Sequence, residues 1–143
     1  FIKKIKNIDK PFFIINGDVL CNFNLGQFLK FHKKNKSFAT MGVRTINSVN
    51  PYGVVKIKGQ SILNITEKPV KKLNINSGIY LLNPNVINFL KNSDFGDFIN
   101  MTDVFLKLIP KKKILHFPLL EKWVDIGDMK SFKIAKKYIE KDL

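Results

Sequence analysis

The chain has 143 residues, of which 45% are apolar and 13 are phenylalanine, so it can form a folded domain with a core of its own. No apolar run approaches the ~20 residues that a membrane span needs, which argues against a membrane partner. The one cysteine, Cys21, cannot form an intramolecular disulfide; this favours a cytoplasmic protein with a buried or strand-edge thiol.

The formal net charge is +14, from 25 basic and 11 acidic residues, which raises nucleic acid as a partner. The lysines are scattered, however, and Arg44 is the only arginine, although arginine is preferred for bidentate recognition of bases and phosphates. We therefore expect most lysines to form solvated faces, and a basic nucleic-acid-binding domain stays a minor alternative.

Apolar periodicity and turn residues predict both strands and helices. In chain order these are a short helical or linking piece over residues 1–8, a strand over 12–17, a helix over 25–34, a strand over 38–44, a hairpin over 52–57 and 61–67, a strand over 76–82, helices over 84–90 and 102–109, strands over 114–117 and 123–125, and a helix over 129–141. The predicted N-caps are Asn24, Thr102 and Asp128, and Pro84 suits a first helical turn. This order favours an α/β fold with a mixed, largely parallel central sheet flanked by helices.

The strand over residues 12–17 is the most informative of these elements. Its four apolar residues predict a strand buried on both faces, and it ends in Asn-Gly-Asp. Asp18 thus follows the carboxyl end of the strand, where open α/β sheets bind ligands. Asp125 occupies a second acidic tip, WVDIGD at residues 123–128. Two separated carboxylates on strand-then-glycine turns suggest a divalent metal site that handles phosphate.

Each of these features also has an ordinary structural interpretation. Asn-Gly and Gly-Asp are common turn dipeptides, and the Asp-Ile-Gly-Asp segment can cap the helix that follows it. His32 and His116 lack metal-ligand spacing and are interpreted as structural or exposed. Large aromatic side chains are candidates for the core: Phe12, Phe13, Phe28, Phe89, Phe105 and Phe132. Packing is also the favoured role of Trp123, although its ring could stack on a base.

Five short motifs occur in a fixed order: FFIINGD at 12–18, PYGVV at 51–55, ITEKP at 65–69, NSGIY at 76–80 and WVDIG at 123–127. Together they resemble the sugar-1-phosphate nucleotidylyltransferases, also called sugar-nucleotide pyrophosphorylases, over essentially the whole chain. The MTDVF segment at 101–105 is similar to the mannose-1-phosphate guanylyltransferase-like branch. The resemblance implies a Rossmann-like fold of the nucleotide-diphospho-sugar transferase type.

The resemblance also implies an activity and a set of site residues. The family transfers a nucleotidyl group from a nucleoside triphosphate to a sugar-1-phosphate, giving a nucleotide sugar and pyrophosphate, with Mg²⁺ as cofactor. By resemblance, the catalytic residues would be Asp18 and Asp125 as magnesium ligands and Lys68 as the contact of the sugar phosphate. Sugar binding would involve Gly53, Glu67, Lys68 and Asn76. Alternatively, residues 52–53, 67–69 and 76–78 are a strand entry, a strand exit and a bulge.

The sequence contains no Gly-rich loop that could cradle a triphosphate, which this family carries upstream of these motifs. We therefore expect residues 1–143 to be the C-terminal portion of one nucleotidylyltransferase domain, inactive by itself and lacking its N-terminal part. A non-catalytic sugar-phosphate-binding module is an alternative, and a homo-oligomer stays open.

Overall fold

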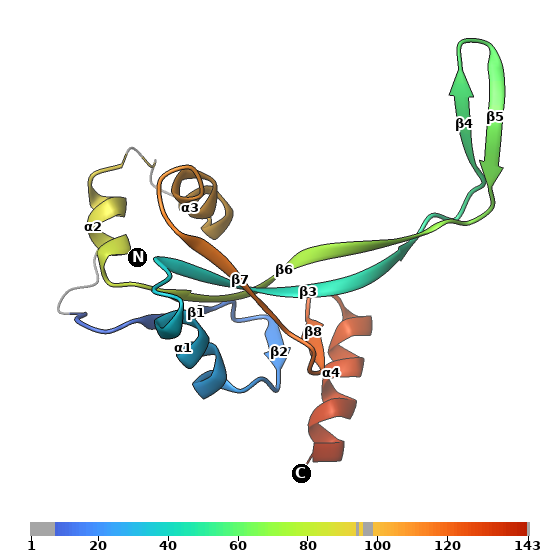
Figure 1. The fold of residues 1–143 in the computed structure, drawn as a ribbon. Helices are drawn as coiled ribbons and strands as arrows, with labels where there is room; N and C mark the ends of the chain where they lie inside the picture. Colours follow the sequence, from blue (N-terminus) through green and yellow to red (C-terminus); the bar gives the residue numbers. More distant parts are fainter. Residues whose placement is uncertain (1–7, 94, 96–98, 143) are drawn as a thin grey trace.

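The computed structural model describes residues 8–93, 95 and 99–142, so the piece predicted over residues 1–8 lies almost wholly outside the described residues. Strands and helices are interspersed along the chain (Figure 1). In order they are β1 (Phe12–Ile15), β2 (Val19–Cys21), α1 (Leu25–Lys34), β3 (Ala39–Val49), β4 (Val54–Lys58), β5 (Ser61–Thr66), β6 (Val70–Leu82), α2 (Asn85–Lys91), α3 (Met101–Leu108), β7 (Ile114–Pro118), β8 (Trp123–Asp125) and α4 (Met129–Asp142).

The central sheet has four strands in the order β1-β6-β3-β7. β3 and β7 are parallel neighbours, whereas β6 is antiparallel to both β1 and β3. Strands β1, β3 and β7 therefore run in one direction and β6 in the other, which confirms the predicted mixed α/β fold with its antiparallel portion.

β6 organises the core because successive side chains of a strand point to opposite faces of its sheet. Tyr80 and Leu82 pack against α2 and α3 in one cluster, while Ile79 and Leu81 pack against Phe28 of α1 in the other. All five side chains are at most 2% exposed. The helices thus cover both faces of the sheet, with α2 and α3 on one side and α1 on the other (Figure 1).

Two helix starts match the predicted caps and one does not. The Asn24 side chain accepts a hydrogen bond from the Gln27 amide at 2.9 Å, and Asp128 accepts one from the Ser131 amide at 2.7 Å. The prediction of Thr102 as an N-cap was wrong, because α3 begins at Met101 and Asn100 is its N-cap residue. Met101 is already helical and begins the apolar period that continues with Val104, Phe105 and Leu108.

The prediction that β1 is buried on both faces was also wrong. Phe12, Phe13 and Ile14 are only partly buried, and Ile15 is 45% exposed. The reason is that β1 lies at the edge of the sheet, where within the described residues it pairs with β6 alone. Phe132, expected in the core, is likewise 50% exposed, on α4.

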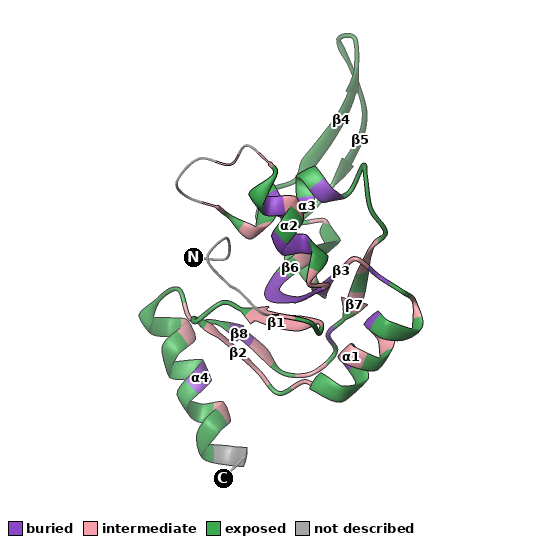
Figure 2. Cartoon of the chain, turned by 90° about the vertical axis from the view of Figure 1, so that its left-hand side faces the viewer, coloured by how far each residue is buried: buried purple, intermediate pink, exposed green. Residues whose placement is uncertain are grey.

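Beyond the core, β3 and β6 continue as a two-stranded ribbon that carries the β4–β5 hairpin away from the body (Figure 1). The ribbon pairs residues 43–49 with residues 70–76. Every residue of β4 and β5 is exposed, which is clear from the continuous green of Figure 2. We call the ribbon and hairpin together, residues 43–76, the arm. The sequence pattern predicted the hairpin but not how far it projects.

Candidate functional site

The first part of the site is a tight turn that follows β1. The Val19 amide donates a hydrogen bond to the Asn16 carbonyl at 3.2 Å, so residues 16–19 form a four-residue turn. The turn leads directly into β2, which sequence analysis missed because it has only three residues. β2 pairs antiparallel with β8, and Val19 lies opposite Asp125.

This pairing brings the backbones of the two predicted metal ligands next to each other. The Ile126 amide donates to the Asp18 carbonyl at 2.8 Å, which extends the ladder by one residue on each strand. Asp18 and Asp125 therefore belong to adjacent cross-strand positions, although they lie far apart in the sequence. Both side chains are exposed, so their carboxylates are open to solvent and ligands.

The donor set at this position fits magnesium. Mg²⁺ is a hard cation that proteins hold through one or two carboxylates, while substrate phosphates and water fill its other positions. Within the described residues, no three His, Cys, Asp or Glu side chains gather into a complete metal cage. Two exposed carboxylates would supply part of the ligands of a metal–phosphate complex.

A bulge in β6 fixes the neighbouring backbone. The register between β3 and β6 shifts from Met41 opposite Tyr80 to Val43 opposite Asn76. Gly78 lies inside this bulge with φ +74°, a conformation that L side chains rarely adopt. The backbone amide of Asn16 donates a hydrogen bond to the carbonyl of Gly78 at 2.8 Å. The bulge interpretation of residues 76–78 is therefore correct, and the bulge also positions Asn16.

Trp123 connects β8 to the same bulge. Its indole Nε1 donates to the Ser77 carbonyl at 2.9 Å, and the Ser77 hydroxyl donates to the Gly42 carbonyl at 2.7 Å. This chain of bonds joins β8, β6 and β3. Trp123 thus has a packing role, as expected, and it helps to hold Asp125 in place.

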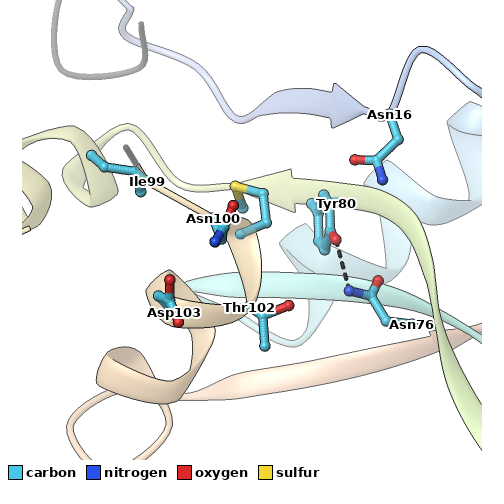
Figure 3. A pocket seen from close by; sticks show the side chains of 8 residues that line it. Asn16, Asn76, Tyr80, Ile99, Asn100, Thr102 and Asp103 are labelled. Carbon is cyan, nitrogen blue, oxygen red and sulfur yellow. Dashed lines mark hydrogen bonds between the residues drawn. The ribbon is translucent and has the colours of Figure 1, made fainter. Parts of the chain in front are cut away.

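A pocket of about 450 Å³ opens beside the turn (Figure 3). Its walls come from the end of β1, from β6 and from the start of α3. The lining residues are mostly polar: Asn16, Asn76, Tyr80, Ile99, Asn100, Met101, Thr102 and Asp103. Because Asn16 and Asp18 belong to one turn, the pocket lies next to the turn that carries Asp18.

Asn76 and Tyr80 form a fixed pair in this pocket. Asn76 accepts a hydrogen bond from the Gly78 amide at 3.0 Å through its oxygen, so its Nδ2 faces Tyr80 and donates to the hydroxyl at 2.7 Å. Burial raises the pKa of Tyr80, which keeps its phenol protonated and able to donate. The predicted sugar-binding residue Asn76 is therefore part of an ordered polar wall.

The other predicted substrate residues lie on the arm. A Cβ added to Gly53 would be 2.8 Å from Oε2 of Glu67, so these two residues are neighbours, as a shared site requires. Lys68 follows directly and has φ +43°, a left-handed conformation that is uncommon outside glycine. Such outliers are frequent at functional positions.

The arm separates these residues from the pocket in this conformation. Within the arm, β6 extends from Val70 to Asn76 with a rise of about 3.3 Å per residue. Lys68 precedes Val70, so it lies about 20 Å or more along the arm from Asn76. Gly53, Glu67 and Lys68 are accordingly absent from the pocket lining. The structure thus makes Asp18 and Asp125 backbone neighbours and places Asn76 in the pocket beside the 16–19 turn, while Gly53, Glu67 and Lys68 form a second group.

Sequence analysis missed several polar residues that line the pocket. Asn16 was read only as part of a turn, Tyr80 as part of a strand, and Asn100 was not singled out. Asp103 entered only through the MTDVF segment, and Thr102 entered through that segment and as a predicted N-cap. A usable signal existed, because both FFIINGD and MTDVF carry polar side chains immediately beside an apolar element.

The described helices include none that is long and apolar enough to cross a membrane.

Comparisons with known proteins agree with the motif order. Residues 1–142 match a family described as nucleotidyl transferase. A mannose-1-phosphate guanyltransferase from Yarrowia lipolytica is 34% identical in an alignment of 128 positions that covers 87% of this chain and 34% of that protein. One from Candida albicans is 29% identical in an alignment of 151 positions that covers 96% of this chain and 41% of that protein. The chain thus spans between a third and about two fifths of the length of these relatives.

A solved structure shows the same fold. A UDP-glucose pyrophosphorylase in complex with UDP-glucose superposes with a TM-score of 0.61 and 20% identity, over 94% of this chain and 58% of that chain. The ordered motifs and the family match lead to one conclusion: the chain belongs to the nucleotidyl transferase family, among the sugar-1-phosphate nucleotidyltransferases that its motifs resemble.

Proposed function

We propose that this chain supplies the sugar-phosphate and metal half of a sugar-1-phosphate nucleotidyltransferase. The reaction is attack by a phosphate oxygen of the sugar-1-phosphate on the α-phosphorus of a nucleoside triphosphate. The bond to the leaving pyrophosphate breaks, and a nucleotide sugar forms. The similarity to mannose-1-phosphate guanyltransferases supports this reaction, with mannose-1-phosphate as the first candidate substrate.

The observation that supports the proposal is the β2–β8 pairing, which makes the backbone of Asp18 a neighbour of the backbone of Asp125. Bound there, Mg²⁺ would supply positive charge for the converging phosphates. The protein's own part is to hold two anionic oxygens at a fixed separation. The turn at 16–19 fixes Asp18, and the Trp123–Ser77 bond restrains β8 and with it Asp125. Such preorganisation lowers the cost of bringing the charged reactants together.

Substrate positioning is divided between the pocket and the arm. In the proposed arrangement Asn76 contacts the sugar ring, Gly53 lets the backbone approach it closely, Glu67 accepts hydrogen bonds from its hydroxyls, and Lys68 holds its phosphate as a point charge. A sugar-1-phosphate is much shorter than the arm. Lys68 can therefore serve the same substrate as Asn76 only when the arm bends toward the body.

We also propose that residues 1–143 are the C-terminal portion of one transferase domain, with the triphosphate cradle outside them. The difference in length from the curated relatives supports this division. Residues 1–143 alone should then give no nucleotide sugar, whereas the same residues joined to an upstream segment should. Robust pyrophosphate release by this chain alone would contradict the division.

The test of the function uses the transferase with its upstream segment. Asp18→Asn and Asp125→Asn each remove one carboxylate charge with little change in shape, and Asp9→Asn is the control on an exposed residue outside the pocket lining. Pyrophosphate release from nucleoside triphosphate and mannose-1-phosphate should fall by about a hundredfold or more in the first two variants only, as expected when a group that stabilises developing charge is lost.

If all three variants keep full activity, Asp18 and Asp125 have only structural roles and the metal assignment is wrong. If the chain binds sugar phosphate but the longer protein has no transferase activity, the non-catalytic binding module is the correct interpretation.

A further inference from the structure

We propose that the start of α3 sets the sugar specificity of this site, with Asp103 reading ring hydroxyls and Thr102 and Asn100 completing the contact. This inference rests on the proposed function and adds the residues that would distinguish one hexose-1-phosphate from another. None of the three belongs to the site predicted from the motifs. All three line the pocket opposite Asn76 and Tyr80 (Figure 3).

The chemistry of the lining selects a neutral polyhydroxyl group over a phosphate. Among the described lining residues there is no Lys or Arg, and the one charged side chain is the carboxylate of Asp103. A carboxylate repels phosphate but accepts strong, charge-assisted hydrogen bonds from hydroxyl groups. The pocket volume of about 450 Å³ lies within the ~300–1,000 Å³ range of small-molecule sites.

The Asn100 side chain does not cap the helix that begins after it. Asn is among the best N-cap residues, and elsewhere in this chain Asn24 and Asp128 both cap their helices through the side chain. Asn100 is the N-cap residue of α3, with extended backbone, yet it makes no side-chain cap hydrogen bond. Its amide lines the pocket instead, where it can both donate to and accept from a hydroxyl group.

Tyr80 provides a second, independent observation. The side chain is 2% exposed, and its hydroxyl accepts from Asn76. Among the hydrogen bonds of the described residues, none uses the Tyr80 hydroxyl as a donor. A buried phenol that lines a polar pocket needs an acceptor for its proton, and a sugar hydroxyl oxygen in the pocket provides one. The wall opposite α3 thus carries a donor for the same ligand.

The test measures binding of hexose-1-phosphates to the 143-residue chain by nuclear magnetic resonance titration. The probes are mannose-1-phosphate, glucose-1-phosphate and inorganic phosphate. The variants are Asp103→Asn and the nearly isosteric Thr102→Val, and the matched control is Asp9→Asn, on an exposed aspartate outside the pocket lining. Thermal unfolding of each variant establishes that it is folded, and Thr102→Val keeps the test decisive if Asp103→Asn does not fold.

We expect Asp103→Asn to weaken binding of the preferred hexose-1-phosphate about tenfold, as the loss of a hydrogen bond to a charged group predicts for an exposed side chain. The ratio between the two epimers should change, while the affinity for inorganic phosphate should stay the same. Thr102→Val should change the epimer ratio in the same assay.

If the wild-type chain binds a hexose-1-phosphate but both variants keep the affinity and epimer ratio of the Asp9→Asn control, this inference is wrong while the proposed function stands. If the wild-type chain binds neither hexose-1-phosphate, the proposed sugar-phosphate half fails and this inference fails with it.

Discussion

Gly78 is the position where backbone geometry, packing and site are most tightly connected. Its φ of +74° is left-handed, and a Cβ added there would lie 2.9 Å from Nδ2 of Asn16 and 3.0 Å from Cγ2 of Val19. Both neighbours belong to the turn that precedes β2. Gly78→Ala should therefore strain the β6 backbone and push this turn outward.

The cost can be worked out against a second glycine. Gly59 also has a positive φ, +58°, but nothing lies within 4 Å of its added Cβ. Gly59→Ala should lower the free energy of unfolding by about 1–2 kcal/mol, because alanine is strained in the left-handed conformation. Gly78→Ala should lose the same backbone contribution and a further amount of about 1–3 kcal/mol through overpacking, so its free energy of unfolding should fall by about 2–5 kcal/mol in total. The smaller unfolded-state entropy of alanine affects both variants alike.

Urea denaturation followed by circular dichroism measures the free energy of unfolding of the wild type and both variants. A loss for Gly78→Ala that exceeds the loss for Gly59→Ala by at least about 1 kcal/mol supports the packing at the turn. Equal losses in the two variants would refute it, because they would show that the turn of residues 16–19 does not pack against Gly78.

Three further predictions concern other parts of the chain. Burial lowers the pKa of His32 below 6.5, so the unfolded state binds more protons than the folded state just below that pH. The free energy of unfolding should therefore fall as pH drops below about 6.5. If urea titrations of His32→Gln give the same slope of unfolding free energy against pH as the wild type, this prediction is contradicted. Asn24→Ala should cost about 1 kcal/mol in urea denaturation because it removes a cap hydrogen bond, whereas Asn100→Ala should cost less; a larger loss for Asn100→Ala would disprove the uncapped start of α3. Lys68→Gly should raise the melting temperature, because glycine adopts the left-handed backbone without strain. In the longer transferase the same change should raise the KM for sugar-1-phosphate, with Lys58→Ala as the control on the same arm. An unchanged KM would make residues 67–69 a simple strand exit.

The helices and the hairpin were predictable because their signals are local. The apolar spacing and the Asn24 cap predicted α1 at its observed bounds, and a glycine between alternating segments predicted the β4–β5 turn. The position of β8 was also predicted correctly, although nothing in its sequence revealed its partner.

The remaining features depend on contacts between distant parts of the chain. β2 is too short for a periodic signal and exists because it pairs with β8. The burial of β1 was overestimated because an apolar run does not show whether its strand is central or at an edge. The pocket joins the end of β1 to the start of α3, so its lining could be found only after both had been placed around β6.

The central claim is that Asp18 and Asp125 hold one divalent ion together, and Mn²⁺ tests it directly as a paramagnetic substitute for Mg²⁺. Substoichiometric Mn²⁺ should broaden the backbone resonances of Asp18, Val19 and Ile126 in the wild-type chain. Either Asp18→Asn or Asp125→Asn should abolish this broadening, and Asp9→Asn should leave it unchanged. Broadening that survives both site variants, or that centres elsewhere on the chain, would contradict the shared metal site.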